Sequence, residues 1–197
     1  MEDKYSRLWK FPVDLTVVDD TLRARFCHGF ERPPLMTKED SEQIMHGVSH
    51  LENMLQSSLF VQQLSVGSFF GDWIANLELE PRPRLVLYSN HDSTLRAVLS
   101  ALKVFDDVWP AYASHLAIEL WEELESSKHY VTFQYNGHIH RLGGPCKDYF
   151  CEYHDFVKLL NSFRTELCDE PGGSLNLELD PIVPRLKPVP ADHKLKI

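Results

Sequence analysis

The sequence predicts an α/β protein in which helices flank a mixed sheet, and three observations support this prediction. Apolar residues recur at helical spacing from about residue 19 to residue 77. A short apolar run at 84–89 then leads directly into another helical pattern, as in a βα unit. Two later runs alternate apolar and polar side chains, which is typical of antiparallel strands. This order of elements indicates the α/β class with a mixed sheet.

Length, composition and charge are those of an ordinary globular protein. The 197 residues are 43% hydrophobic and 25% charged, so the chain can bury a sizeable core. The net charge of −9 and the lack of a basic stripe argue against nucleic acid as a partner. No apolar run approaches the roughly 18 residues of a membrane span, and the amino end lacks the apolar stretch of a secretory signal. These features alone suggest a cytosolic protein.

Three helical stretches precede the first predicted strand. Residues 19–34 are expected to form a short helix that runs into a loop closed by prolines. Thr37 and Asp40 have the spacing of a capping pair and should begin the second helix. Residues 61–77 form a third helical pattern, whose continuity is weakened by two internal glycines. The second helix carries one apolar stripe, made of Ile44, Val48, Leu51 and Leu55.

The predicted βα unit places two polar residues side by side at its turn. Arg84 to Ser89 should form a short core strand, and Asp92 or Ser93 should cap the helix that follows. His91 and Asp92 would then lie between the strand's carboxyl end and the helix's amino end. Ligands collect at this position in α/β proteins, and the free N–H groups and the helix dipole favour an anion. The plainer alternative is a cap beside a solvated neighbour.

The second half of the chain is predicted to contain antiparallel strands and a closing helix. Period-2 alternation indicates a strand at His115 to Trp121. The pair Asn136-Gly137 favours a type I′ turn between two further strands. A helix is expected at about 152–167, with Phe156, Leu159, Leu160 and Phe163 on one face. From Pro171 onward the proline-rich sequence indicates an extended or disordered tail.

The four cysteines and ten histidines were considered as disulfide or metal sites. Cys146 and Cys151 are five residues apart, so they could close a small disulfide loop, although free thiols are equally compatible with the spacing. A zinc site is disfavoured because there is no CxxC pair and the histidines are scattered. His138 and His140 share one face of a predicted strand, but no third ligand is evident.

One long block resembles the carboxyl-terminal motif region of the histidine acid phosphatases, the second branch of the histidine phosphatase superfamily. The block is LVLYSNHDSTLRAVLSALKVFDDVWPAYASHLAIELWE. Weaker similarity joins DDTLRARFCHG to the family's helical cap, and CKDYFCEYHDF to its small disulfide loop and closing helix. The resemblance extends from about Val13 to Cys168. The collinear matches beyond His91 and Asp92 are Leu95, Leu102, Phe105, Pro110, Tyr112 to Ser114, Glu119 and Leu120.

The resemblance implies a phosphomonoester hydrolase that works through a phosphohistidine intermediate and needs no metal or organic cofactor. His91 matches the histidine that hydrogen-bonds the phosphoryl oxygens, and Asp92 matches the general acid that protonates the leaving alcohol. A cationic imidazole at a helix amino end suits developing negative charge, and a neighbouring phosphate favours a protonated carboxyl in mild acid. The substrate stays open among lipid phosphates, sugar phosphates and generic monoesters. The family also implies a bridge between Cys146 and Cys151.

One family motif is absent. The nucleophilic histidine of the family lies in Arg-His-Gly-x-Arg-x-Pro, and the nearest string here is CHGFERPP, which has the wrong spacing and a leading cysteine. The resemblance places this string in the cap, so His28 is not expected to be the nucleophile. The chain is therefore expected to be the carboxyl-terminal half of such an enzyme, as in a partial gene model, a splice product or a degenerate copy. The alternative function is a non-catalytic module that binds a partner or an anion.

The same resemblance divides the chain and leaves several properties open. Residues 1–168 correspond to the carboxyl-terminal part of the enzyme domain, with a partial helical cap at 13–80 and an α/β part at 81–168, and 169–197 form the tail. Cys27 and Cys168 lack evident partners, because His115 replaces a family cysteine and Cys168 resembles one that pairs with the other half. Family members are mostly secreted or lysosomal and often dimeric, whereas this chain has no signal sequence, so compartment and oligomeric state are left open.

Overall fold

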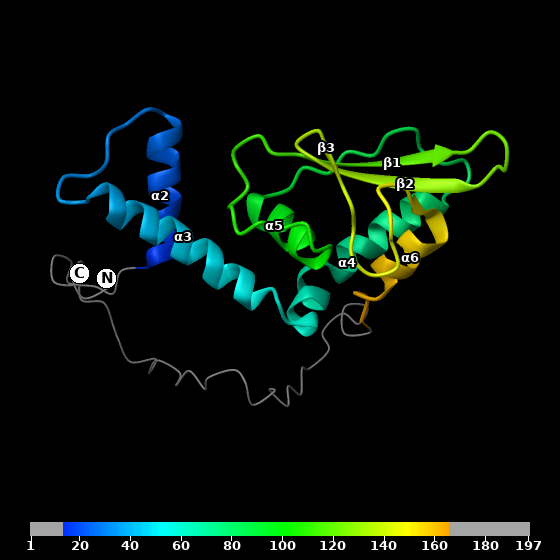
Figure 1. The fold of residues 1–197 in the computed structure, drawn as a ribbon, viewed down its shortest axis with the longest axis horizontal. Helices are drawn as coiled ribbons and strands as arrows, with labels where there is room; N and C mark the ends of the chain where they lie inside the picture. Colours follow the sequence, from blue (N-terminus) through cyan, green and yellow to red (C-terminus); the bar gives the residue numbers. More distant parts are fainter. Residues whose placement is uncertain (1–13, 166–197) are drawn as a thin grey trace, which may run out of the picture.

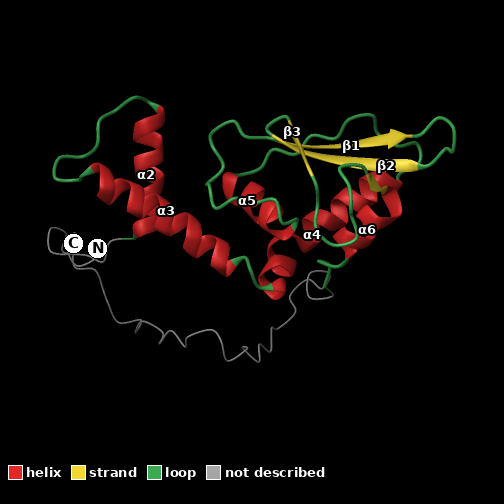
Figure 2. Cartoon of the chain, in the orientation of Figure 1, coloured by secondary structure: helices red, strands yellow, loops and turns green. Residues whose placement is uncertain are grey.

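The structure is a computed structural model, and it describes residues 14–165 of the 197-residue chain. The described residues form both helices and a small sheet, which confirms the α/β class (Figures 1 and 2). The predicted tail at 169–197 and Cys168 lie outside the described residues. The elements in chain order are α2 (Leu15–Cys27), α3 (Lys38–Leu55), α4 (Leu59–Glu78), α5 (Asp92–Ala101), β1 (Leu116–Glu122), β2 (His129–Tyr135), β3 (His138–His140), β4 (Cys151–Glu152) and α6 (Tyr153–Asn161).

Helices α2 and α3 form one end of the molecule (Figure 1). The predicted capping box begins α3, because the Thr37 hydroxyl accepts the Asp40 amide at 3.0 Å and the Asp40 carboxylate accepts the Thr37 amide at 3.1 Å. The two helices enclose a small core of Leu22, Ile44 and Val48. The predicted apolar stripe is therefore half right, since Leu51 and Leu55 further along α3 are 55% and 54% exposed.

The third helix, α4, is continuous over 20 residues despite its two glycines. Gly67 is required by packing rather than by backbone conformation, because a Cβ at this position would lie 2.6 Å from the carbonyl oxygen of Phe163. Val66, Phe70 and Ile74 turn toward the larger core of the molecule, which α4 shares with α5, α6 and the sheet. Within residues 14–165, none of the helices combines the length and apolarity needed to cross a membrane.

The four described strands form one antiparallel sheet, which lies over α4 and α6 (Figures 1 and 2). Strand β2 pairs with β1, β3 and β4. The turn between β2 and β3 confirms the predicted type I′ hairpin, since Asn136 and Gly137 have φ angles of 50° and 80°. The strand expected at His115 to Trp121 is β1, shifted by one residue.

The prediction of a core strand at Arg84 to Ser89 is wrong. These residues precede α5 without helix or strand structure, and their main chain makes no hydrogen bond to another described residue. Leu85, Val86 and Leu87 are 74%, 39% and 84% exposed. An apolar run becomes a strand only when another strand offers main-chain partners, and residues 14–165 place none beside this run. The parallel component of the predicted mixed sheet is therefore not formed here.

The cysteine loop leads into the last described helix. Cys146 and Cys151 form a disulfide with an S–S distance of 2.00 Å and a Cα–Cα distance of 4.9 Å, which confirms the predicted bridge. Helix α6 ends at Asn161, earlier than the expected residue 167. Its apolar face is buried as expected, and Phe156, Leu159, Leu160 and Phe163 all belong to the larger core. Cys27 is an exposed free thiol at the end of α2.

Candidate active site

Helix α5 begins at the two residues that the sequence singles out. His91 is the N-cap, with an extended backbone (φ −96°, ψ 161°), and its carbonyl oxygen accepts the amides of Thr94 and Leu95 at 3.0 and 3.1 Å. Asp92 is the first helical residue, and its Oδ1 accepts the adjacent Ser93 amide at 2.8 Å. The predicted cap at Asp92 or Ser93 is therefore wrong by one position, because the main-chain carbonyl of His91 already closes the first turn.

The second carboxylate oxygen of Asp92 has a partner from a distant part of the sequence. The indole Nε1 of Trp109 donates to Asp92 Oδ2 at 2.7 Å. Both oxygens of Asp92 thus accept hydrogen bonds from N–H donors. This arrangement fixes the orientation of an otherwise exposed side chain.

Two arginines lie over the ring of Trp109. The guanidinium carbons of Arg23 on α2 and Arg96 on α5 are 5.6 and 5.2 Å from the ring centroid. Both distances fall within the range of cation–π attraction. Trp109 therefore joins the loop after α5 to the helical pair α2–α3 and to the start of α5.

Each of these arginines is itself held by a carboxylate. Arg96 pairs with Glu52 of α3 at 2.9 Å and donates to its carbonyl oxygen at 3.0 Å. Burial lowers the pKa of the Arg96 guanidinium, and the negative charges of Glu52 and Asp92 oppose this change. Arg23 pairs with Asp19 at 2.9 Å, and burial raises the pKa of Asp19 in spite of this contact.

Tyr112 and His91 are two further exposed polar groups of this region. Tyr112 is 58% exposed, and its pKa is raised, first by partial loss of hydration and then by the charges of Asp20, Cys27 and Asp92. The His91 side chain is exposed and makes no hydrogen bond to another described residue. Its imidazole is thus available at the start of α5, next to the oriented carboxylate of Asp92.

The part of the chain that matches a known family contains His91, Asp92 and Trp109. The model of the histidine phosphatase superfamily (branch 2) matches residues 7–136, which is more than half of the protein. The chain belongs to this superfamily. The resemblance seen in the sequence is therefore confirmed at the level of the family.

Several curated members of the superfamily are similar to the chain. Counting factor 60 of Dictyostelium discoideum is 24% identical over 143 residues, which are 71% of this chain and 34% of that protein. Human lysophosphatidic acid phosphatase type 6 is 29% identical over 129 residues, 66% of this chain and 28% of the relative. Human 2-phosphoxylose phosphatase 1 is 48% identical over 52 residues, 26% of this chain and 11% of the relative. The chain spans about a third or less of the length of these relatives.

The string CHGFERPP lies where α2 ends. His28 is the C-cap of α2 and is exposed, and Gly29 follows with a φ angle of 71°. The string therefore forms the exit of a helix, and no strand precedes it among the described residues. Trp109 is the residue that the sequence analysis missed. The sequence offers no local pattern that predicts a role for Trp109, although it lies within the motif block.

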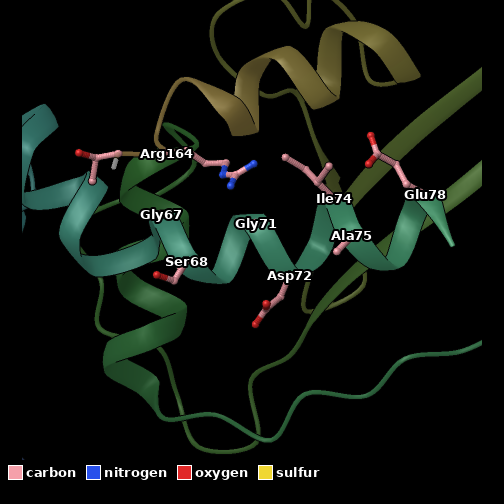
Figure 3. A pocket seen from close by; sticks show the side chains of 9 residues that line it. Gly67, Ser68, Gly71, Asp72, Ile74, Ala75, Glu78 and Arg164 are labelled. Atoms are coloured by element: carbon pink, nitrogen blue, oxygen red, sulfur yellow. The ribbon is translucent and has the colours of Figure 1, made fainter. Parts of the chain in front are cut away.

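A pocket of about 510 Å³ lies elsewhere, between α4 and the residues after α6. Figure 3 shows Arg164 extending along α4 past Gly71, in the space between α4 and α6. None of its lining residues comes from α5, so this pocket is separate from His91 and Asp92. Within residues 14–165, no group of three His, Cys, Asp or Glu side chains is arranged to hold a metal ion.

Proposed function

We propose that the chain supplies part of the active site of a phosphomonoester hydrolase of the histidine phosphatase type. In this proposal Asp92 is the general acid that protonates the leaving alcohol, and His91 binds the phosphoryl oxygens of a phosphohistidine-forming reaction. The observation that supports it is the pairing of the two residues at the start of α5, with the Asp92 carboxylate oriented by Trp109. The family membership of the chain and the phosphatase names of two of its relatives agree with it.

The chemistry follows from the position of the two residues. The first amides of α5 and the helix dipole stabilise negative charge, and the exposed imidazole of His91 at the N-cap offers an N–H donor on the same side. A carboxyl group that meets a bound phosphate is favoured in its protonated form, which lets it donate to the leaving oxygen. The resemblance assigns the nucleophile to an Arg-His-Gly-x-Arg-x-Pro motif, and the 197 residues contain no such string.

The test compares the chain with a fusion in which the amino-terminal part of a lysophosphatidic acid phosphatase precedes it. The 197-residue chain should show no turnover of an aryl phosphate above background, because a covalent mechanism needs its nucleophile. In the active fusion, Asp92→Asn should slow alkyl phosphates by about 100- to 10,000-fold and aryl phosphates much less, since only poor leaving groups need the proton. His28→Ala is the matched control and should leave turnover unchanged.

Three results would contradict the proposal. An equal loss for alkyl and aryl phosphates in the Asp92→Asn fusion would indicate structural damage rather than loss of a general acid. Turnover by the unfused chain that disappears in His91→Ala would show that the nucleophile lies within these 197 residues. Loss of turnover in His28→Ala would return CHGFERPP to the candidate nucleophiles.

A non-catalytic binding module is the second candidate function. It is favoured by the exposed apolar run Leu85-Val86-Leu87, which offers a surface to another polypeptide. Two results together would support this function instead. The purified chain would form a stable complex with a protein partner, and the substitutions His91→Ala and Asp92→Asn would leave the phosphatase activity of the fusion unchanged.

We also propose that the chain divides into a helical cap region at 13–80 and an α/β part at 81–168. The separate small core of α2 and α3 supports a distinct cap. Helix α4 lies within the proposed cap region by sequence, but its buried side chains belong to the larger core. Its packing therefore ties the cap region to the α/β part.

A further inference from the structure

We propose that Trp109 is a positioning residue, which holds the Asp92 carboxylate in the orientation needed to act on a ligand at the start of α5. This inference rests on the proposed function of Asp92. Trp109 lies in the loop between α5 and β1, and its indole Nε1 donates to Asp92 Oδ2 at 2.7 Å. Without that bond, Asp92 would keep only the contact between Oδ1 and the neighbouring Ser93 amide.

An indole suits this task because of its hydrogen-bonding capacity. Its N–H group is a donor only, so it can fix one carboxylate oxygen without accepting the proton that Asp92 would transfer. A histidine, a tyrosine or a water molecule in the same place could accept that proton. The 2.7 Å bond to Oδ2 and the 2.8 Å bond to Oδ1 together define the plane of the carboxylate.

The ring of Trp109 is held in turn by the two arginines. Arg23 and Arg96 lie over it at 5.6 and 5.2 Å, and each guanidinium is paired with a carboxylate on α2 or α3. A cation over an aromatic ring is attracted to its π face, so the two guanidinium groups help to fix the orientation of the indole. Three helices therefore contribute to the position of one indole N–H.

The surroundings of Asp92 contain further charges that any titration experiment must include. The groups on α2 and α3 interact with Asp92 directly or through Trp109 and its arginines. The other groups belong to α5, to its N-cap or to the loop after it. They are Asp19, Arg23, Glu52, His91, Arg96 and Tyr112.

The first experiment follows the indole N–H resonances of the full chain by NMR across a pH titration. The Trp109 resonance should shift as Asp92 gains its proton, and Asp92→Asn should abolish this shift. Trp121 provides an internal control for the substitution, because its Nε1 donates to the Thr132 hydroxyl at 3.2 Å and that hydroxyl donates to Glu119 rather than to Asp92. Its resonance should therefore be the same at each pH in the protein and in Asp92→Asn. A Trp109 resonance that is the same in the protein and in Asp92→Asn at every pH would overturn the inference.

The second experiment measures the side-chain rotamer of Asp92 from its Hα–Hβ couplings. The full chain should show one large and one small coupling, as expected for a single rotamer, and Trp109→Phe should average them. Phenylalanine keeps an aromatic ring beside the arginines and removes the N–H donor together with one ring of the indole. Trp121→Phe is the matched control and should leave the Asp92 couplings unchanged. Equal couplings in the full chain and in folded Trp109→Phe would overturn the inference.

The two experiments also separate this inference from the proposed function. Neither NMR measurement requires turnover, so failure of the proposed function would be seen only in the leaving-group assay. If Trp109→Phe does not fold, the Asp92→Asn titration alone decides whether the indole and the carboxylate are coupled.

Discussion

Asp19 is a buried carboxylate in the middle of α2, and its side chain is only 4% exposed. Its partner Arg23 also donates to Ser49 Oγ at 3.2 Å and to the Met45 carbonyl oxygen at 3.3 Å, so this pair joins α2 to α3. Burial nevertheless outweighs the contact with Arg23 and raises the pKa of Asp19 above the usual 3.8. The folded state therefore binds a proton at Asp19 more tightly than the unfolded state does.

This pKa shift predicts the sign of a pH dependence. The contribution of Asp19 to stability is fully present below the unfolded pKa, and it is lost as pH rises through the higher folded pKa. This titration is absent in Asp19→Asn. As pH rises from the unfolded to the folded pKa of Asp19, the free energy of unfolding of the unsubstituted protein should therefore fall relative to that of the variant. Urea titrations at a series of pH values measure it. Asp19→Ser should give the same flattened profile, and a variant profile parallel to that of the protein would contradict the prediction.

Single residues could be predicted from the sequence where the interaction is local. The capping box of Thr37 and Asp40 spans three positions, and the turn at Asn136-Gly137 spans two, so both were found. The bond between Asp92 and Trp109 spans 17 positions and depends on how the loop after α5 folds back. No pattern within a helix or a strand contains that information.

At the scale of the elements, α4 packs closely against the segment after α6 at Gly67. Of the described glycines, Gly67 leaves the least space for a side chain. The Cβ of an alanine at position 67 would lie 2.6 Å from the Phe163 carbonyl oxygen, and this oxygen belongs to the main chain. The neighbour cannot move aside like the end of a flexible side chain. One of the two segments must therefore shift if the methyl group is added.

Gly67→Ala should lower the free energy of unfolding by about 1–3 kcal/mol, the usual cost of overpacking. Gly71→Ala is the matched control one helical turn later, because its Cβ would meet only the Arg164 side chain at 3.7 Å. That variant should gain up to about 1 kcal/mol from the helix propensity of alanine. Thermal and urea unfolding of both variants provides the measurement. Equal effects at the two positions would show that α4 and Phe163 are not in close contact.

The run at 84–89 is the segment whose secondary structure the sequence predicted wrongly. Its composition is that of a buried strand, yet a strand exists only by pairing with another segment. The helices α3, α4 and α5 could be predicted because their main-chain bonds are internal to each segment. The hairpin of β2 and β3 could be predicted because its partner is two residues away.

At the scale of the whole molecule, the described chain has two hydrophobic cores of very different size. The core between α2 and α3 contains three buried hydrophobic residues, and the core shared by α4, α5, α6 and the sheet contains eighteen. The contacts that join α3 to the larger part are polar, and they include Arg96 with Glu52 and Asn53 with Asp107.

The unequal cores predict unequal local stability. Amides of α2 and α3 should exchange hydrogen with solvent faster than those of α4 and α6, because less apolar surface is buried when these helices fold. Hydrogen exchange of the full chain, resolved by mass spectrometry of peptides, measures this difference. Uniform protection across all four helices would show that the molecule opens as a single unit.

The exposed run from Leu85 to Tyr88 has one more consequence. Proteases bind their substrates as extended strands, through main-chain groups and alternate side chains. This run has neither helix nor strand structure, its main chain bonds to no other described residue, and its two leucines are 74% and 84% exposed. The described fold therefore leaves at 85–88 the unpaired, accessible main chain that a protease needs. Cleavage there requires no opening of either core, so the free energy of unfolding does not limit its rate.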